Sequence, residues 1–206
     1  MIRGIIFDMD GVLIESRDWH FQALNESLNL FGFEITPEMH RGEFDGLPTR
    51  IKLEKLTQTK NLPIKLHPII NKIKQERTLR IIAAKCYPSP QHIILMSALR
   101  RNGIPIALAT NSIYETTKEV LTRAKLIDFF RFITTNEDVR HPKPNPEIYT
   151  ISCRKLGLSP NEVLVIEDNH HGVQSATSAG CKVLRVANPH DVHIQAVNQY
   201  FDGRLI

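Results

Sequence analysis

Short apolar segments alternate with helical patterns along most of this 206-residue chain. These segments are short, apolar and rich in residues that favour β-structure, so we expect strands at residues 3–7, 104–109, 132–134, 163–166 and 182–186. Their near-continuous apolar character is typical of strands covered on both faces of a parallel sheet. The patterns between them predict helices at residues 90–102, 113–124, 146–156 and 171–179. This alternation predicts an α/β fold, a doubly wound parallel sheet with helices on both faces.

Several of the predicted helix ends coincide with capping residues. Ser112 with Glu115 fits a capping box, in which the two side chains bond the first turn of a helix. Asn145 before Pro146 fits an N-cap followed by a proline in the first turn. Gly157 follows the last periodic residue of the same helix, as a C-terminal cap does.

One long segment interrupts the alternation. Between residues 16 and 86 the sequence shows helical periodicity and almost no strand pattern, with helices expected at 19–31, 37–41, 50–57 and 67–83. Since this segment follows the first strand directly, we expect it to form a separate helical cap domain near that strand's C-terminal end. The predicted domains are therefore an α/β core of residues 1–15 and 87–206, and a cap of residues 16–86.

Polar groups follow four of the five predicted strands. In chain order they are Asp8 and Asp10, then Thr110 and Asn111, then Lys143, and then Glu167 and Asp168. Because the carboxyl ends of parallel strands meet at one edge of a sheet, we expect these groups to share one crevice.

This set of groups suits phosphoryl transfer. A carboxylate nucleophile can form an aspartyl-phosphate, and a second carboxylate can transfer protons as general acid and base. Carboxylate oxygens are the ligands that Mg²⁺ prefers, and a hydroxyl, backbone amides and a lysine can bind phosphate oxygens. Each group alone also fits a structural role: an acidic turn, a helix cap, or a solvated lysine. Their combination favours catalysis.

The segments FDMDGVLIES, ATNS, KPNPEIY and VIEDNHHGVQSATSAG, in this order, resemble the haloacid dehalogenase-like (HAD) hydrolases. The resemblance is to the branch that has a helical cap after its first motif and includes many phosphatases and the β-phosphoglucomutases. It implies a Rossmann-like α/β core with an inserted helical cap. Dehalogenases of this family do not need the carboxylates that correspond to Asp10 and Asp168. The presence of both here therefore favours phosphate chemistry.

The resemblance also implies a role for each residue. Asp8 would be the nucleophile and Asp10 the general acid/base. Mg²⁺ would be held by Asp8, by the backbone carbonyl of Asp10 and by Asp168, with Glu167 nearby or ligating. The phosphate-binding groups would be Thr110, Asn111 and Lys143.

Two cap residues are candidates for substrate contacts. His20 aligns with a histidine of the mutase-like branch, although a plain helix histidine fits as well. Arg50, in Pro48-Thr49-Arg50, follows a segment that resembles the cap's specificity loop. In the β-phosphoglucomutases an arginine that binds a distal phosphate stands one position earlier. One step along a helix rotates a side chain by about 100°, so this shift favours a monophosphatase over a mutase.

The function expected from the sequence is a Mg²⁺-dependent phosphatase that hydrolyses a small phosphorylated metabolite, such as a sugar phosphate. Two alternatives remain open. A phosphomutase would use the same first half-reaction and return the phosphate to another hydroxyl. A non-catalytic phosphoacceptor or binding protein would keep the fold without turnover.

Composition limits the classes of partner that we expect for this chain. The net charge is only +4 and there is no block of lysine and arginine, so we expect no nucleic-acid partner. We also expect no membrane partner, because no apolar run approaches the length of a span. The absence of a signal-peptide pattern and the three scattered cysteines predict a cytoplasmic protein with reduced thiols. A monomer is expected.

Overall fold

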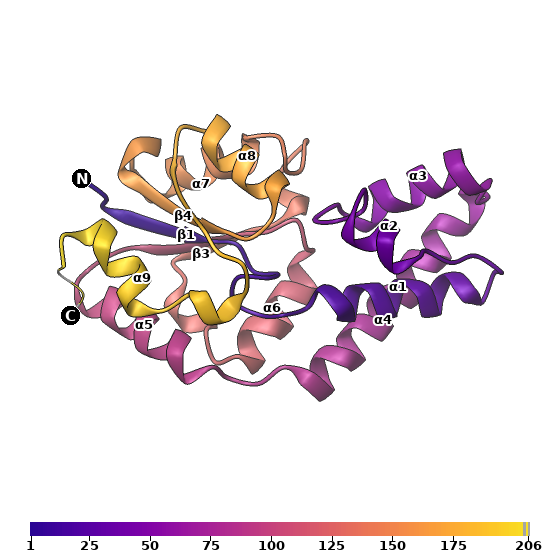
Figure 1. The fold of residues 1–206 in the computed structure, drawn as a ribbon, viewed down its shortest axis with the longest axis horizontal. Coiled ribbons are helices and arrows are strands. Elements are labelled where there is room, and N and C mark those ends of the chain that lie inside the picture. Colours follow the sequence, from indigo (N-terminus) through magenta and orange to yellow (C-terminus); the bar gives the residue numbers. More distant parts are fainter. Residues whose placement is uncertain (204, 206) are drawn as a thin grey trace. The chain divides into compact units, whose positions relative to one another are not determined.

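A computed structural model describes residues 1–203 and 205. It contains a five-stranded sheet with the strand order β3-β2-β1-β4-β5, in which every pairing is parallel. Strands β1, β3 and β4 of this sheet are labelled in Figure 1. The strands are β1 (Gly4–Phe7), β2 (Ile106–Ala109), β3 (Phe132–Thr134), β4 (Val163–Glu167) and β5 (Lys182–Arg185). The predicted α/β fold with a parallel sheet is confirmed. Strand β4 runs one residue further than expected and takes in Glu167.

Helices cover both faces of the sheet. They are α5 (Pro90–Arg101), α6 (Tyr114–Arg123), α7 (Glu147–Leu156), α8 (His170–Ser178) and α9 (Ile194–Asn198). Helices α7 and α8 lie on one face, and α5 and α6 lie on the other (Figure 1). Strands β1, β2 and β4 are fully buried, as their apolar sequences predict.

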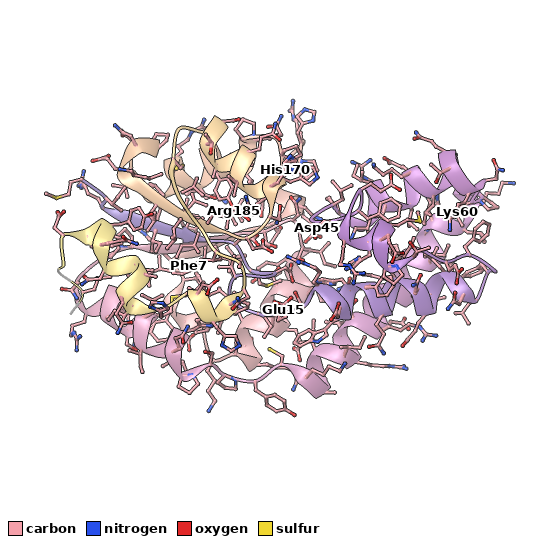
Figure 2. The ribbon with its side chains drawn as sticks, in the orientation of Figure 1. Phe7, Glu15, Asp45, Lys60, His170 and Arg185 are labelled. Atoms are coloured by element: carbon pink, nitrogen blue, oxygen red, sulfur yellow. The ribbon has the colours of Figure 1, made fainter. Side chains whose placement is uncertain are left out.

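Strand β1 occupies the middle of the sheet. Ile5 is in register with Ile106 of β2 on one side and with Leu164 of β4 on the other. Phe7, the last residue of β1, is labelled in Figure 2. Since the three strands end at similar heights, the residues that follow them emerge at one edge of the sheet.

Two predicted helix caps differ in the structure. Helix α6 begins after Ile113 without a side-chain cap, so the capping box expected of Ser112 and Glu115 is wrong. The physical reason is that the Ser112 hydroxyl donates to the more distant Asp10 instead. Asn145 does bond the first helical residue of α7, accepting from the Glu147 amide at 3.0 Å, but it stands one position before the N-cap.

The segment between β1 and α5 is helical. Its helices are α1 (Arg17–Asn29), α2 (Pro37–Arg41), α3 (Thr49–Lys60) and α4 (His67–Lys85). They enclose an apolar core of their own, which includes Leu24, Phe44, Leu53 and Ile70. The chain accordingly separates into two compact units, Met1–Glu15 with Cys86–Ile206, and Ser16–Lys85.

Short 3-10 turns complete the structure at Ile64–Leu66, Ile127–Phe129, Asn136–Asp138, Pro160–Glu162, Pro189–Asp191 and Gln199–Phe201. None of the helices in the described part of the chain combines the length and the apolar character that a membrane span needs.

Candidate active site

The first candidate group stands directly after β1. Asp8 is 4% exposed, and Asp10 lies two residues further along a tight turn. Gly11 makes this turn with a φ of +82°, a conformation that side chains disfavour. A Cβ atom at Gly11 would stand 2.1 Å from Oδ2 of Asp168. The turn therefore needs glycine both for its backbone and for the approach of the Asp168 carboxylate.

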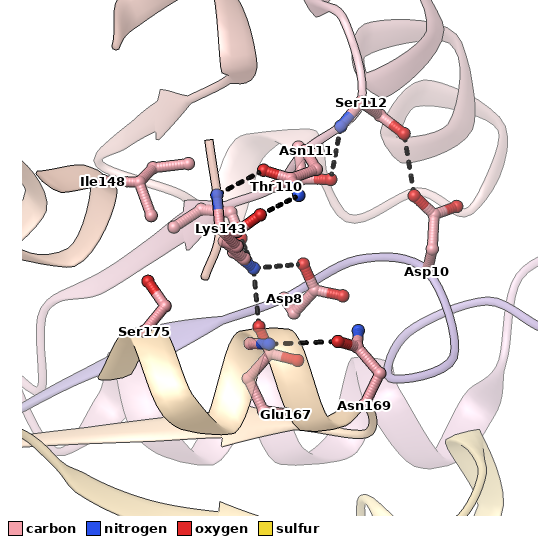
Figure 3. Close-up of polar contacts among 12 residues, drawn as sticks. Asp8, Asp10, Thr110, Asn111, Ser112, Lys143, Ile148, Glu167, Asn169 and Ser175 are labelled. Carbon is pink, nitrogen blue, oxygen red and sulfur yellow. Dashed lines mark hydrogen bonds and ion pairs between the residues drawn. The ribbon is translucent and has the colours of Figure 1, made fainter. Parts of the chain in front are cut away.

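Lys143 joins the ends of three strands. Its Nζ atom donates to Oδ1 of Asp8 at 2.7 Å and to Oε1 of Glu167 at 2.6 Å (Figure 3). It also donates to the carbonyl oxygen of Ala109 at 2.9 Å. The side chain is 3% exposed, and the Lys143–Pro144 peptide bond is cis. All three donor positions of the ammonium are thus used, which fixes its place beside Asp8.

Glu167 is fully buried and bonded on both oxygens. Oε1 accepts from Lys143 and, at 2.5 Å, from the hydroxyl of Tyr149, while Oε2 accepts from the Asp168 amide at 3.2 Å. Gly172 leaves room for this carboxylate, because a Cβ atom there would stand 1.9 Å from Oε1. These contacts make Glu167 the anchor of Lys143.

Burial and charge perturb this cluster. Burial raises the pKa of Asp8 well above its usual range, and the neighbouring carboxylates of Glu167 and Asp168 add to the effect, which Lys143 opposes. Burial disfavours the charged form of Lys143, but the Asp8 and Glu167 carboxylates outweigh it and raise the pKa of the ammonium. Lys143 therefore stays charged, and one cation faces several carboxylates.

The arrangement fits a divalent cation. Asp8, Glu167 and Asp168 each offer an oxygen, these atoms lie within 4.8 Å of one another, and all three residues are buried. Buried carboxylates that crowd one another are stabilised by a cation or a shared proton between them, and Lys143 supplies only one positive charge. Since Glu167 already accepts hydrogen bonds on both oxygens, Asp8 and Asp168 are the better ligands of the three.

The loop after β2 carries the next candidates. Thr110 is 1% exposed, and its hydroxyl accepts from the Ser112 amide at 3.1 Å. The side chain of Asn111 holds the backbone of Lys143, accepting from its amide at 3.1 Å and donating to its carbonyl at 3.4 Å. The structure thereby brings Thr110, Asn111 and Lys143 together, with the Asn111 side chain joining the two loops.

Asp10 also contacts this loop. Its Oδ2 atom accepts a hydrogen bond of 2.8 Å from the hydroxyl of Ser112 (Figure 3). Asp10 is more exposed than Asp8, so its carboxylate lies toward the solvent side of the cluster. A group at that position can exchange protons with a substrate or with water.

The two candidate substrate-binding residues of the helical unit, Ser16–Lys85, contact side chains of the same unit. His20 of α1 lies with Nδ1 3.4 Å from Nζ of Lys74 on α4. Arg50, near the start of α3, is exposed and pairs with Glu54 at 2.6 Å one turn later on the same helix. These contacts belong to the helical unit alone.

Comparison with known proteins agrees with this geometry. Residues 5–186 match the family model described as haloacid dehalogenase-like hydrolase. The chain belongs to the haloacid dehalogenase-like hydrolases.

Relatives within the HAD hydrolases include phosphatases. The chain is 29% identical over 179 residues to a phosphorylated carbohydrates phosphatase of Thermotoga maritima, covering 87% of this chain and 82% of that protein. It is 25% identical over 183 residues to a fructose-1-phosphate phosphatase of Escherichia coli, covering 89% and 95%. The fold is shared with a β-phosphoglucomutase of Clostridium difficile, with a TM-score of 0.85, 21% identity, and coverage of 100% and 97%. The chain is thus a HAD phosphatase with a helical cap.

Two residues of this HAD site, Tyr149 and Ser112, have contacts that the sequence does not predict. Tyr149 was part of a recognised segment, but nothing in its spacing indicates that its hydroxyl contacts Glu167. Ser112 was assigned to a helix cap, and its bond to Asp10 spans 102 positions. Tyr149 did carry one signal, since a tyrosine on the buried face of a helix usually needs a hydrogen-bond partner.

Proposed function

We propose that this HAD phosphatase is a Mg²⁺-dependent enzyme that hydrolyses a small phosphorylated metabolite, such as a sugar phosphate, through an aspartyl-phosphate on Asp8. The observation that carries the proposal is the buried Asp8 carboxylate, bonded by Lys143 at 2.7 Å and close to the carboxylates of Glu167 and Asp168. An ordinary structural ion pair has no need for that number of carboxylates in one buried place.

In the first half-reaction, the Asp8 carboxylate attacks the phosphorus atom and displaces an alcohol. Lys143 fixes the orientation of this carboxylate through Oδ1. Asp10 donates a proton to the leaving oxygen, so that an alcohol departs rather than an alkoxide. Holding Asp8 rigidly lowers the entropic part of the barrier.

In the second half-reaction, water hydrolyses the aspartyl-phosphate. Asp10, now ionised, removes a proton from this water, and inorganic phosphate leaves. Its position at the exposed side of the cluster suits a group that first gives a proton to the leaving oxygen of the substrate and then takes one from water.

Charge on the transferred phosphoryl group is met by fixed donors. The Thr110 hydroxyl and the backbone amides before α6 suit this role, and the Lys143 ammonium, whose three hydrogen bonds are already made, contributes its positive charge. Asp8, Asp168 and the backbone carbonyl of Asp10 would hold Mg²⁺. When bound, this ion neutralises the carboxylates and polarises the phosphoryl group.

A sugar phosphate is the proposed substrate class because of the relatives. The Thermotoga protein is named for phosphorylated carbohydrates, and the Escherichia coli protein for fructose-1-phosphate. Two such relatives, each aligned over most of its length, support a phosphorylated carbohydrate or polyol here.

Phosphate release from a panel of phosphorylated sugars and polyols, with Mg²⁺ and with EDTA, tests the proposal. We expect turnover of one or a few compounds that EDTA abolishes, with Asp8→Asn as the inactive control. Isomerised sugar phosphate without free phosphate would identify a mutase instead. Tight binding without turnover of any compound would identify a non-catalytic protein.

A further inference from the structure

Two cysteines lie in contact in the core unit. The sulfur atoms of Cys153 and Cys181 are 3.5 Å apart and share a hydrogen bond, although the residues are 28 positions apart. Cys153 belongs to α7, and Cys181 stands just before β5. Both pack into one apolar cluster, where Cys153 is buried and Cys181 is half-buried. A small shift would bring these sulfurs to the bonding distance of about 2.05 Å.

The remaining cysteine is differently placed. The thiol of Cys86 is buried and contacts the carbonyl oxygen of Val120 at 3.6 Å. Burial raises its pKa to about 11, which keeps it protonated and unreactive. Cys86 therefore serves as an internal control for the reactivity of the pair.

The pairing favours reaction at Cys153. The hydrogen-bonded contact with Cys181 lowers the pKa of Cys153, and this outweighs the opposing effect of burial. A thiol with more thiolate character is the better nucleophile toward an oxidant or an oxidised sulfur. Half-buried Cys181 gives a small oxidant access to the pair.

Each cysteine of the pair lies on or next to an element that contacts Glu167 or pairs with its strand. On α7, Cys153 stands one helical turn after Tyr149, whose hydroxyl bonds Oε1 of Glu167. On the other side, β5 follows Cys181 directly, and Arg185 of β5 (Figure 2) is in register with Glu167. A bond that draws α7 and β5 together therefore acts on the residue that anchors Lys143.

We propose that Cys153 and Cys181 form a reversible oxidation site, in which a peroxide converts the two thiols into a disulfide that slows the phosphatase. One sulfur attacks an oxygen of the peroxide, breaks the O–O bond and becomes a sulfenic acid. The other half of the peroxide leaves as water or, from an organic peroxide, as an alcohol. The second sulfur attacks this sulfenic sulfur, forms the S–S bond and releases water. Two thiols thus lose two electrons and two protons, and the peroxide takes them up. The effect on rate rests on the proposed function, whereas the disulfide itself does not.

Peptide mass spectrometry tests the site directly. The full-length protein is treated with hydrogen peroxide, its remaining thiols are alkylated, and its peptides are compared before and after dithiothreitol. We expect a linked pair of peptides carrying Cys153 and Cys181, about 2 Da lighter than the sum of the reduced peptides. The link should persist in Cys86→Ser and disappear in Cys181→Ser and in Cys153→Ala. Unlinked peptides, or oxidation of Cys86 instead, would overturn the site.

The rate of phosphate release tests the effect on the enzyme. We expect peroxide to lower kcat of the wild type about tenfold, dithiothreitol to restore it, and Cys181→Ser to resist peroxide. A protein that carries the disulfide but has an unchanged kcat would overturn the proposed effect on rate, while the oxidation site itself would stand. Equal loss in Cys181→Ser would also overturn it, because the damage would then lie elsewhere. If the untreated protein released no phosphate, the proposed function would fail while the mass measurement still decided the site.

Discussion

The hydroxyl of Ser112 donates a hydrogen bond of 2.8 Å to the carboxylate of Asp10, joining the loop after β2 to the loop after β1. Ser112 is itself fixed, because its amide donates to the Thr110 hydroxyl at 3.1 Å. The proposed general acid is thereby oriented by the same loop that carries a proposed phosphate-binding group. Proton transfer and phosphate binding are coupled through one short segment.

Replacing Ser112 with alanine should impair leaving-group protonation. For sugar phosphates, we expect kcat/KM to fall about tenfold, the kinetic equivalent of roughly 1.4 kcal/mol. For p-nitrophenyl phosphate, whose leaving group needs little protonation, the loss should be less than about threefold. The conservative variant Ser112→Thr should restore most of the rate. Equal losses for both substrates would show that Ser112 does not act through Asp10.

Replacing Tyr149 with phenylalanine should loosen the Lys143 anchor. The change removes the hydroxyl that bonds Glu167 and keeps the buried ring. We expect a stability loss of about 1–2 kcal/mol, measured by urea unfolding, together with a lower kcat. Tyr200→Phe, in the C-terminal 3-10 turn, is the matched control and should change neither quantity. An unaltered kcat in Tyr149→Phe would show that this tyrosine does not position Lys143 for catalysis.

Replacing Gly11 with alanine should weaken metal binding specifically. Both Gly11 (φ +82°) and Gly103 (φ +68°) have positive φ, so alanine at either costs about 1–2 kcal/mol of strain. Only at Gly11 does the new Cβ collide with the Asp168 carboxylate, since nothing lies within 4 Å of a Cβ at Gly103. We expect Gly11→Ala to need about tenfold more Mg²⁺ for half-maximal rate, and Gly103→Ala to match the wild type. Equal Mg²⁺ requirements would contradict the assignment of Asp168 as a ligand.

His40 should make the protein less stable in mild acid. Burial and the positive charge of Lys52 lower the pKa of His40 from 6.5 to about 4 in the folded state. Between these values the unfolded chain binds a proton that the folded protein does not, so stability falls as the pH drops from 6.5 toward 4. Melting temperatures at pH 7 and pH 5 measure this loss. His40→Gln should reduce the difference between them.

Local sequence patterns locate the polar groups of the site but not the partners that their side chains bond. Placing Asp8, Thr110 and Glu167 at the ends of strands needs only local apolar patterns and the convergence of parallel strands. The choice of partner depends on distances across the sheet that no local pattern records. Ser112 shows this: its position favours a helix cap, yet the structure gives its hydroxyl to Asp10. Tyr149 shows the same, since its hydroxyl meets a strand 18 positions away.

The rate of phosphate release by Asp8→Asn tests the central claim most directly. The change keeps the size of the side chain and removes the nucleophilic carboxylate, and a melting curve would show that the fold persists. With a substrate that the wild type hydrolyses in the presence of Mg²⁺, we predict that release falls about 10³-fold or more. Release at a rate comparable to the wild type would contradict attack by Asp8 and the covalent mechanism with it.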